Sequence, residues 1–403
     1  MIVASWLATV SACYGNPRIS GHDAGAGRGG SGGAGLTGTS GTSGTGGASV
    51  PGGANGSAAG VGGADGSSCS ALTASDPRNC GACGHDCMGG MCEGGECRPF
   101  KLAAIQHESA RTIGVSSELV LVGGTTYLNG AAAIYLVGKN EGAVTRTRPQ
   151  RVDGSYSRRL AGTTATLIAA DVFTPGAALY YLSHCSIGDC SVTIPPVGSY
   201  TFDGIHDFAI DPARGRVFWF DPTSNELIAT NADEWSPASF GPASVTGHAD
   251  CLAMAQGTGT VFGVFDYGVF AVSEDGDATP RIVSGVPSDA LVVDIAVSPD
   301  ALILLLSSGT LLKAPLPAGI GNKLPDALPG ITNVTAIATS GSTLFWAGTS
   351  TIYRCSLPLC AQIIPIAQDT AVVADIVADD KALYWLSRLD NTDPTSSVMR
   401  VAF

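Results

Sequence analysis

Residues 335–366 read TAIATSGSTLFWAGTSTIYRCSLPLCAQIIPI, and this stretch carries the pattern that decides the fold. It holds four short runs of apolar, β-branched and aromatic residues, at 335–338, 343–346, 350–354 and 362–366. Runs of this kind, separated by turn residues such as Gly and Ser, are typical of β-strands. No long stretch of the chain keeps a helical period of apolar residues, so we expect an all-β domain.

The same four-strand pattern recurs along the chain from residue 100 onward. Its first strand is a short apolar run, often preceded by Asp, that returns roughly every 40 residues after a longer first step. The anchor residues of these first strands are Ile113, Leu167, Phe208, Leu252, Ile295, Ile337 and Ile376. Aromatic second strands follow at residues 179–182, 217–220, 343–346 and 382–385. This repeat predicts a seven-bladed β-propeller over residues 100–403, or a six-bladed one if the long first repeat folds differently.

The two ends of the repeat region complement each other. Residues 398–403 form a third strand with no fourth strand behind it, and residues 101–105 form an apolar strand that belongs to no repeat. Pairing these two strands would close the ring and remove exposed sheet edges, which invite aggregation. We therefore predict that the strand at residues 101–105 completes the last blade.

The N-terminal region has the features of an export signal followed by a linker. Residues 1–12, MIVASWLATVSA, are apolar and then small, and they run directly into Cys13. Val10-Ser11-Ala12-Cys13 resembles the lipobox of bacterial lipoproteins, in which the cysteine after the cleaved leader receives a lipid. The leader lacks the basic residues that usually open a signal peptide, and an ordinary export signal is the alternative. Residues 13–68 are nearly all Gly, Ser, Ala and Thr, a composition that favours a disordered linker.

Residues 69–98 form a cysteine-rich module with too few apolar residues to build a hydrophobic core. In an exported protein, an even number of closely spaced cysteines predicts disulfides. The six cysteines are Cys69, Cys80, Cys83, Cys87, Cys92 and Cys97, and the sequence leaves their pairing open. A zinc site is the alternative. Its four ligands would be Cys80, Cys83, His85 and Cys87.

Two further cysteine pairs share the spacing C-x4-C, Cys185 with Cys190 and Cys355 with Cys360. Each pair follows an aromatic strand, where a turn would bring the two cysteines within disulfide reach, so we predict two local disulfides. Cys251, the remaining cysteine, falls in an apolar first strand. We expect it to be buried as a small hydrophobic residue.

Acidic and imidazole side chains precede several of the first strands, a position that rings the mouth of the central channel in a propeller. These residues are His206, Asp207, His248, Asp250, Asp294 and Asp375. One hypothesis is that they form a metal or general-base site. The alternative is that each Asp accepts hydrogen bonds from backbone amides of a turn. Outside the Gly/Ser-rich linker the chain has no G-x-S-x-G, H-E-x-x-H or Walker motif, so we name no catalytic residue, metal or cofactor.

The aromatic second strands and the repeat length resemble those of the YWTD, NHL and gluconolactonase-like propellers. The whole plan resembles surface proteins of myxobacteria that join a lipobox, a Gly/Ser-rich linker, a cysteine-rich module and a propeller. The most specific match is the run Asn79-Cys80-Gly81-Ala82-Cys83-Gly84-His85-Asp86-Cys87. This resemblance implies a location and a fold, because proteins of this plan mostly lack assigned activities.

The charge of the chain bears on its partners. Lys and Arg number 21 against 34 Asp and Glu, a net charge of −13. Nucleic-acid binding needs clustered basic residues, so this balance argues against a nucleic-acid partner. We expect a monomeric lipoprotein of the outer membrane or cell surface, attached to the membrane through its lipid only. Its propeller would bind an extracellular protein or glycan, and the alternative is a propeller-type hydrolase or lyase that uses the channel mouth.

Overall fold

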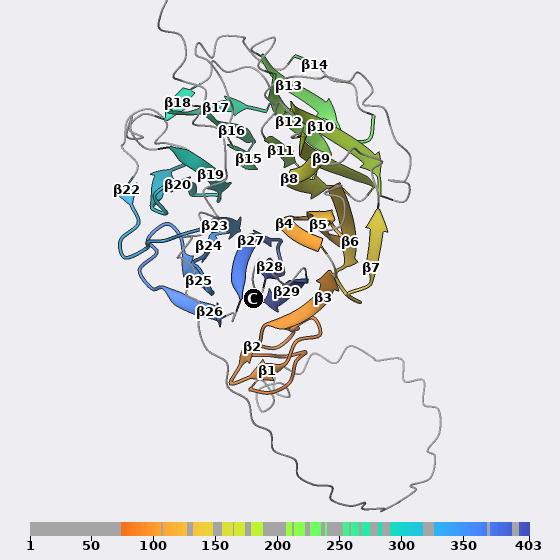
Figure 1. Ribbon diagram of the computed structural model, residues 1–403. Helices are drawn as coiled ribbons and strands as arrows, with labels where there is room; N and C mark the ends of the chain where they lie inside the picture. Colours follow the sequence, from red (N-terminus) through yellow and green to blue (C-terminus); the bar gives the residue numbers. More distant parts are fainter. Residues whose placement is uncertain are drawn as a thin grey trace, which may run out of the picture. The chain divides into compact units, whose positions relative to one another are not determined.

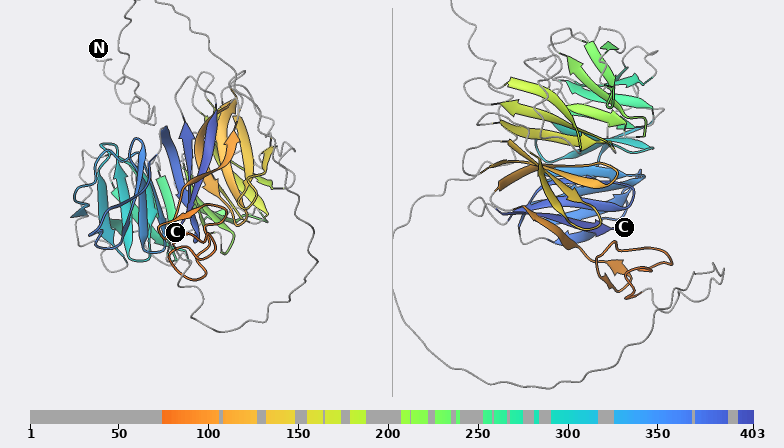
Figure 2. Two further views of the ribbon diagram at one scale, coloured as in Figure 1. Left: turned by 90° about the horizontal axis from the view of Figure 1, so that it is seen from below. Right: turned by 90° about the vertical axis from the view of Figure 1, so that its right-hand side faces the viewer.

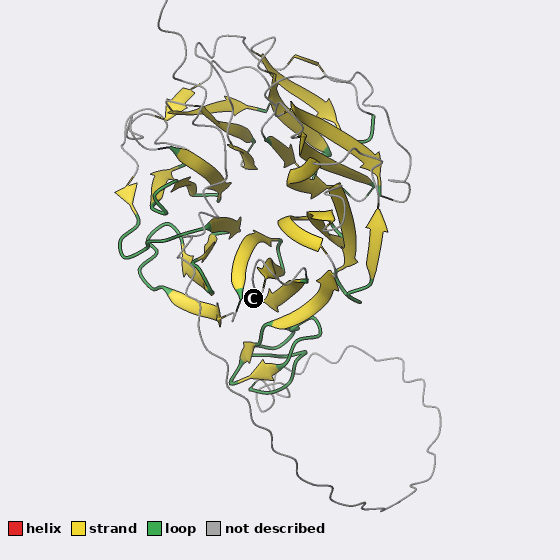
Figure 3. Cartoon of the chain, viewed as in Figure 1, coloured by secondary structure: helices red, strands yellow, loops and turns green. Residues whose placement is uncertain are grey.

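The computed structural model describes most of the chain from residue 74 onward, and every regular element in that part is a β-strand (Figure 3). None of the described residues belongs to a helix long and apolar enough to cross a membrane. By its contacts, one compact unit runs from Cys69 to Phe403. The described residues are 74–403 except 106–107, 127–131, 148–154, 164, 174–178, 188–206, 212, 222–225, 235–237, 240–252, 258, 266–267, 275–280, 284–290, 317–325, 369–370 and 389–394.

Most strands of the described residues form seven antiparallel sheets, six with four strands and one with three, which we number as blades 1 to 7. Blade 1 contains β4 (Glu108–Val115), β5 (Leu119–Thr126), β6 (Ala132–Gly138) and β7 (Val144–Thr147). Blade 2 contains β8 (Ser155–Gly162), β9 (Thr166–Phe173) and β10 (Leu179–Ser186). Blade 3 contains β11 (Phe208–Asp211), β12 (Arg216–Asp221), β13 (Glu226–Asn231) and β14 (Ala238–Ser239).

The remaining blades follow the same plan, with the strands paired in chain order. Blade 4 contains β15 (Ala253–Gly257), β16 (Thr260–Phe265), β17 (Gly268–Ser273) and β18 (Arg281–Val283). Blade 5 contains β19 (Val292–Val297), β20 (Ala301–Leu306), β21 (Leu311–Pro315) and β22 (Asp326–Ala327). Blade 6 contains β23 (Ala336–Ser340), β24 (Thr343–Ala347), β25 (Thr351–Ser356) and β26 (Ile364–Gln368). Blade 7 contains β27 (Val372–Ala378), β28 (Ala382–Arg388), β29 (Ser396–Ala402) and β3 (Phe100–Ile105).

The seven sheets form a closed ring (Figure 1). The innermost strands contact one another in the order β4, β8, β11, β15, β19, β23 and β27, and β27 contacts β4 again. One hydrogen bond recurs in every blade: the amide of the residue after the third strand donates to the carbonyl just before the second strand. The donor and acceptor pairs are Lys139 and Glu118, Ile187 and Ala165, Ala232 and Gly215, Glu274 and Gly259, Leu316 and Asp300, Leu357 and Ser342, and Phe403 and Lys381. The prediction of a β-propeller is confirmed, and the described strands form seven blades.

The ring is closed by the strand that the sequence left without a repeat. β3 pairs antiparallel with β29, with Ile105 opposite Ser396 and Phe100 opposite Arg400. Ala103 and Ile105 of β3 are buried because they face the neighbouring sheet, whereas Lys101 is exposed beyond a register shift opposite Met399. Blade 7 therefore joins the start of the propeller to its end, as predicted.

Blade 2 corrects two of the predicted strands. Leu167 was expected on the innermost strand, but it lies in β9, the second strand, and Leu160 in β8 takes the innermost position. Residues 179–182, expected as a second strand, lie in the third strand β10. The polar stretch SYSRRLAG of β8 concealed the innermost strand, because a β-bulge between Ser157 and Arg159 interrupts its alternation.

A smaller correction applies to blade 4. In blade 4, Met254 lies opposite Gly263. The equivalent pair in blade 7 is Ile376 opposite Trp385. Met254 rather than Leu252 is therefore the anchor of the innermost strand, and Leu252 lies outside the described residues.

Aromatic side chains of the second strands fill the space between blades. Trp219, Trp346 and Trp385 occupy the same position in β12, β24 and β28, and all three are buried. Each removes a large apolar surface from water, which contributes roughly 1.5 to 3 kcal/mol per side chain. The core of the molecule therefore lies between the sheets, and the ring is held by contacts from blade to blade.

The cysteine-rich module precedes β3 and packs on blade 7. It contains one short hairpin, β1 (Cys92–Glu93) and β2 (Glu96–Cys97), and it lies beside the end of β29 and the start of β3 (Figure 2). Gly89 lies against the side chains of Arg400 and Phe100. Met88 packs against two buried clusters, one of blades 6 and 7 and one of blades 7 and 1. The module is therefore in contact with the blade that closes the ring.

Candidate functional site

The predicted channel-mouth aspartates lie at the innermost strands, and two of them bridge adjacent blades. Asp207 is buried just before β11, and its Oδ1 accepts the amide of Phe208 at 2.9 Å. Its Oδ2 accepts the amide of Met254 in blade 4 at 2.7 Å. One carboxylate therefore holds the innermost strands of two blades in register.

Asp375 does the same where the ring closes. Its Oδ1 accepts the amide of Ile376 at 3.0 Å, and its Oδ2 accepts the amide of Ile113 in blade 1 at 3.1 Å. The hydroxyl of Thr112 donates to the same Oδ2 at 3.3 Å. We call Asp207 and Asp375 the blade-bridging aspartates. Hydrogen bonds to an ionised group typically contribute about 1.5 to 3 kcal/mol.

Asp294 is similar in position, since its Oδ1 accepts the amide of Ile295 at 2.9 Å in blade 5. The three aspartates thus lie on blades 3, 5 and 7, which are not neighbours in the ring. In the structure, Asp207, Asp294 and Asp375 accept hydrogen bonds from backbone amides, as in the alternative to a metal or general-base site. His206, His248 and Asp250 lie outside the described residues, as do Cys251 and the lipidation candidate Cys13.

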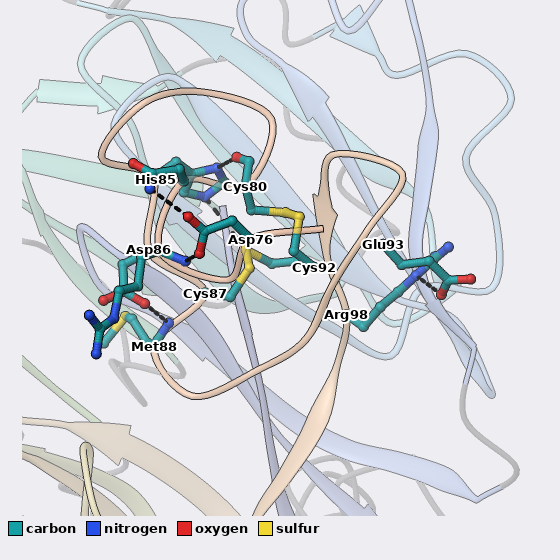
Figure 4. Close-up of a disulfide and its surroundings, with 12 residues drawn as sticks. Asp76, Cys80, His85, Asp86, Cys87, Met88, Cys92, Glu93 and Arg98 are labelled. Carbon is teal, nitrogen blue, oxygen red and sulfur yellow. Dashed lines mark hydrogen bonds and ion pairs between the residues drawn. A yellow bond between two sulfur atoms is a disulfide. The ribbon is translucent and has the colours of Figure 1, made fainter. Parts of the chain in front are cut away.

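Two disulfides cross-link the cysteine-rich module. Cys80 pairs with Cys92 and Cys87 with Cys97, with Cα atoms 5.5 and 5.2 Å apart (Figure 4). All four cysteines are buried. The four zinc ligands suggested by the spacing are therefore not brought together. Cys80 and Cys87 belong to different disulfides, and Cys83 is exposed. Cys69 lies outside the described residues.

A third disulfide, Cys355–Cys360, lies at the end of β25 in blade 6, with Cα atoms 5.0 Å apart. Both cysteines are buried against the apolar residues between blades 5 and 6. The backbone of Cys185 lies in β10, whereas the side chain of Cys185 and all of Cys190 lie outside the described residues.

A buried charged cluster between blades 1 and 7 was not predicted from the sequence. Lys139 follows β6, and its Nζ donates to Asp379 at 2.7 Å and to the carbonyl of Ser117 at 3.2 Å. The hydroxyl of Tyr384 donates to the same Asp379 carboxylate at 3.2 Å. Burial by itself raises the pKa of Asp379, but hydrogen bonds from Lys139 and from backbone amides outweigh it, so the net pKa is lowered. Burial, with the nearby charge of Asp379, raises the pKa of Tyr384.

Arg400 lies at the centre of this cluster, only 1% exposed. Its Nη1 donates to the carbonyl of Lys139, and its guanidinium lies over the ring of Phe100, 4.8 Å from the centroid. Burial lowers the pKa of Arg400. One side chain therefore contacts blade 1, the closing strand and the module together.

A second interblade ion pair occupies the matching position in blades 3 and 4. Glu274 follows the third strand β17 as Lys139 follows β6, and its carboxylate accepts Arg214 at 2.6 Å. In the other five blades the corresponding residue is apolar, namely Ile187, Ala232, Leu316, Leu357 and Phe403. The sequence signal for both ion pairs was a charge at a repeat position that is otherwise apolar.

Comparison with known proteins identifies the fold and no family. No family model matches the chain, and no curated protein matches it. Similar solved structures include a catalytically inactive virginiamycin B lyase from Staphylococcus aureus with quinupristin (TM-score 0.51, 13% identity, covering 76% of this chain and 99% of that chain). The WD40 repeats of RRP9 reach a TM-score of 0.52 at 10% identity, covering 76% of this chain and 97% of that chain. The Pan2 WD40 domain of Neurospora crassa reaches 0.50 at 10% identity, covering 75% and 95%. At these identities the similarity shows that this chain is a β-propeller, and nothing of its activity.

Proposed function

We propose that the protein is an exported, lipid-anchored surface module whose propeller binds an extracellular protein or glycan. The observation that carries this proposal is that two of the channel-mouth carboxylates bind backbone amides of adjacent blades. Asp207 and Asp375 each accept backbone amides from two blades, so their oxygens are committed to holding the ring. A general base must take a proton from a substrate, whereas these carboxylates already serve to hold adjacent blades together.

The disulfides support an extracytoplasmic location. Three of them occur among the described residues, and disulfides persist in oxidising compartments outside the cytosol. The composition of residues 13–68 suits a flexible tether between a lipid at Cys13 and the compact unit.

The anchoring part is tested by expressing the full chain and its Cys13→Ser variant in a Gram-negative host fed an alkyne-labelled fatty acid. We expect label and membrane recovery for the unaltered chain and neither for the variant. A chain that is exported and labelled equally in both forms would contradict lipidation at Cys13.

The binding part is tested by applying the purified, oxidised chain to arrays of bacterial and extracellular glycans and to immobilised surface proteins. In parallel, the chain is assayed for hydrolysis or elimination on exported esters, lactones and glycans. Saturable binding without turnover supports the proposal. Turnover that disappears in an Asp294→Asn variant of unchanged melting temperature would instead establish an enzyme working at the channel mouth.

A further inference from the structure

The sulfur atoms at the centre of the cysteine-rich module lie close enough to surround one metal ion. Those of Cys80, Cys87 and Cys97 are all within 4.8 Å of one another, and the three residues are buried. They come from two different disulfides that lie side by side, so reduction of both would leave three thiols around one point. Three cysteines need a fourth ligand to complete the tetrahedral set that zinc prefers.

His85 is oriented to be that fourth ligand (Figure 4). Its Nδ1 lies 2.6 Å from the carbonyl oxygen of Cys80, and because a carbonyl only accepts, Nδ1 carries the hydrogen. In the neutral ring, Nε2 then carries the lone pair, and it points at the sulfur of Cys97, 3.8 Å away. A disulfide sulfur has no hydrogen to donate, and among the described residues no other group donates to Nε2. A backbone carbonyl that fixes the tautomer in this way is the usual support of a metal-binding histidine.

We propose that the reduced module binds one zinc ion, or another thiophilic divalent cation, through Cys80, Cys87, Cys97 and His85. This set differs from the one suggested by spacing, because Cys97 replaces the exposed Cys83. The module would then have two cross-linked forms, one with disulfides in an oxidising medium and one with a metal in a reducing medium.

The conversion balances with a simple reductant. For each disulfide, one trialkylphosphine molecule takes the oxygen of one water molecule and becomes the phosphine oxide, while the disulfide gains two electrons and two protons and becomes two thiols. The metal ion then displaces the protons of three thiols. Cys92 is left as a thiol outside the site.

Contacts other than the disulfides hold the ligands near one another. The amide of Cys80 donates to the carbonyl of His85 at 2.9 Å, and the amide of Cys87 donates to the carbonyl of Pro77 at 2.7 Å. Asn79 is fixed by Asp76 at 2.7 Å. The four paired cysteines also share one buried cluster with the residues of blades 6 and 7. These contacts do not depend on the disulfide bonds, so we expect them to support the module when its disulfides are reduced.

The test is a cobalt titration of the full chain, reduced with a phosphine under argon and freed of metal. We expect the thiolate-to-cobalt absorption of a tetrahedral site, saturating at one ion per chain, and zinc should displace the cobalt. The oxidised chain should give no such absorption. His85→Ala should weaken cobalt binding by about tenfold or more, and Cys97→Ser should remove the three-thiolate spectrum.

Matched variants separate this site from the other thiols. The double variant Cys69→Ser/Cys83→Ser and the double variant Cys355→Ser/Cys360→Ser should both bind cobalt as the unaltered chain does. Each variant is first checked for its remaining disulfides and its melting temperature in the oxidised form. The proposal is overturned if the reduced chain shows no thiolate absorption, if His85→Ala binds normally, or if the Cys69/Cys83 variant loses binding.

Discussion

At the scale of single residues, the ring depends on a few buried charged side chains, each of which contacts two blades. Lys139 and Asp379 have side chains only 9% and 14% exposed, so solvent screens their interaction weakly. Removing one partner of such a pair leaves the other charge buried without compensation, which destabilises more than the pair itself stabilises. The same argument applies to the carboxylate of Asp207, which is buried and accepts two amides.

Asp379→Asn should lower the free energy of unfolding by about 2 kcal/mol at neutral pH. The pKa of Asp379 is lower in the folded protein than in the unfolded chain, so its contribution is fully present above the unfolded value. It is lost as the pH falls through the folded value. The difference between the two proteins in urea unfolding should therefore shrink steadily below about pH 4. Asp380→Asn, at the exposed neighbouring position, should change the stability by less than about 0.5 kcal/mol, and an equal effect of the two variants would contradict the role of Asp379.

Asp207→Asn should lower the free energy of unfolding by about 2 kcal/mol, because an amide cannot accept hydrogen bonds at both of its ends. Thermal unfolding of the purified chain measures this effect. Glu118→Gln, an exposed change of the same chemical kind, is the control and should melt as the unaltered chain does. A normal melting temperature for Asp207→Asn would show that the carboxylate is free for another task.

At the scale of strands and turns, a residue in one blade can be compared with the residue at the equivalent position in another blade. Blades 2 and 6 each have a cysteine at one such position. Cys355 lies opposite Leu344 in blade 6, and Cys185 lies opposite Leu167 in blade 2. Leu344 and Leu167 are both the second residue of the second strand, so Cys185 and Cys355 occupy the same place. Because the two cysteines occupy equivalent positions, we expect both to form the same kind of bond.

We therefore expect a disulfide between Cys185 and Cys190 that matches Cys355–Cys360. With two pairs in the module assigned, we also expect Cys69 to pair with Cys83. Mass spectrometry of a non-reducing digest reads both bonds directly. Peptides that join Cys185 to Cys251, or Cys69 to any cysteine other than Cys83, would contradict these assignments.

The strands also show what the sequence could and could not predict. Aspartate followed by an apolar run was enough to locate β11, β19 and β27, because the aspartate that accepts the amide of the next residue is itself part of the pattern. β8 was missed because two arginines and a bulge remove the alternation on which strand prediction depends. The pairing of the module's cysteines could not be predicted from the sequence, because their spacing is compatible with many pairings. His85 appeared in a candidate zinc set, but its orientation toward Cys97 depends on the fold.

At the scale of the whole molecule, stability depends on the closure of the ring through blade 7. β3 supplies the outer strand of that blade, and the module, Arg400 and Lys139 all meet beside it. An opened ring would expose the edge of β29 and the apolar space between blades 7 and 1. Exposed edges of this kind pair with other chains.

Ala103→Asp places a charge in the buried face of β3 and should open this closure. We expect a lower melting temperature and soluble oligomers or aggregates, measured by size-exclusion chromatography with light scattering. Lys101→Asp, at an exposed position of the same strand, is the matched control and should remain a monomer of normal stability. If both variants behave alike, the closing strand does not hold the ring.

The pairing of β3 with β29 also fixes when the protein can fold. The amide of Ala110 in blade 1 binds the hydroxyl of Ser396 in blade 7, 286 residues further along the chain. Contacts between such distant segments form late and slowly, because closing the long loop costs conformational entropy before the contacts can stabilise the fold. A nascent chain can assemble single blades but cannot complete the ring until β29 has been synthesised. The strand β3 therefore has to stay without its partner strand until the other end of the repeat region is available.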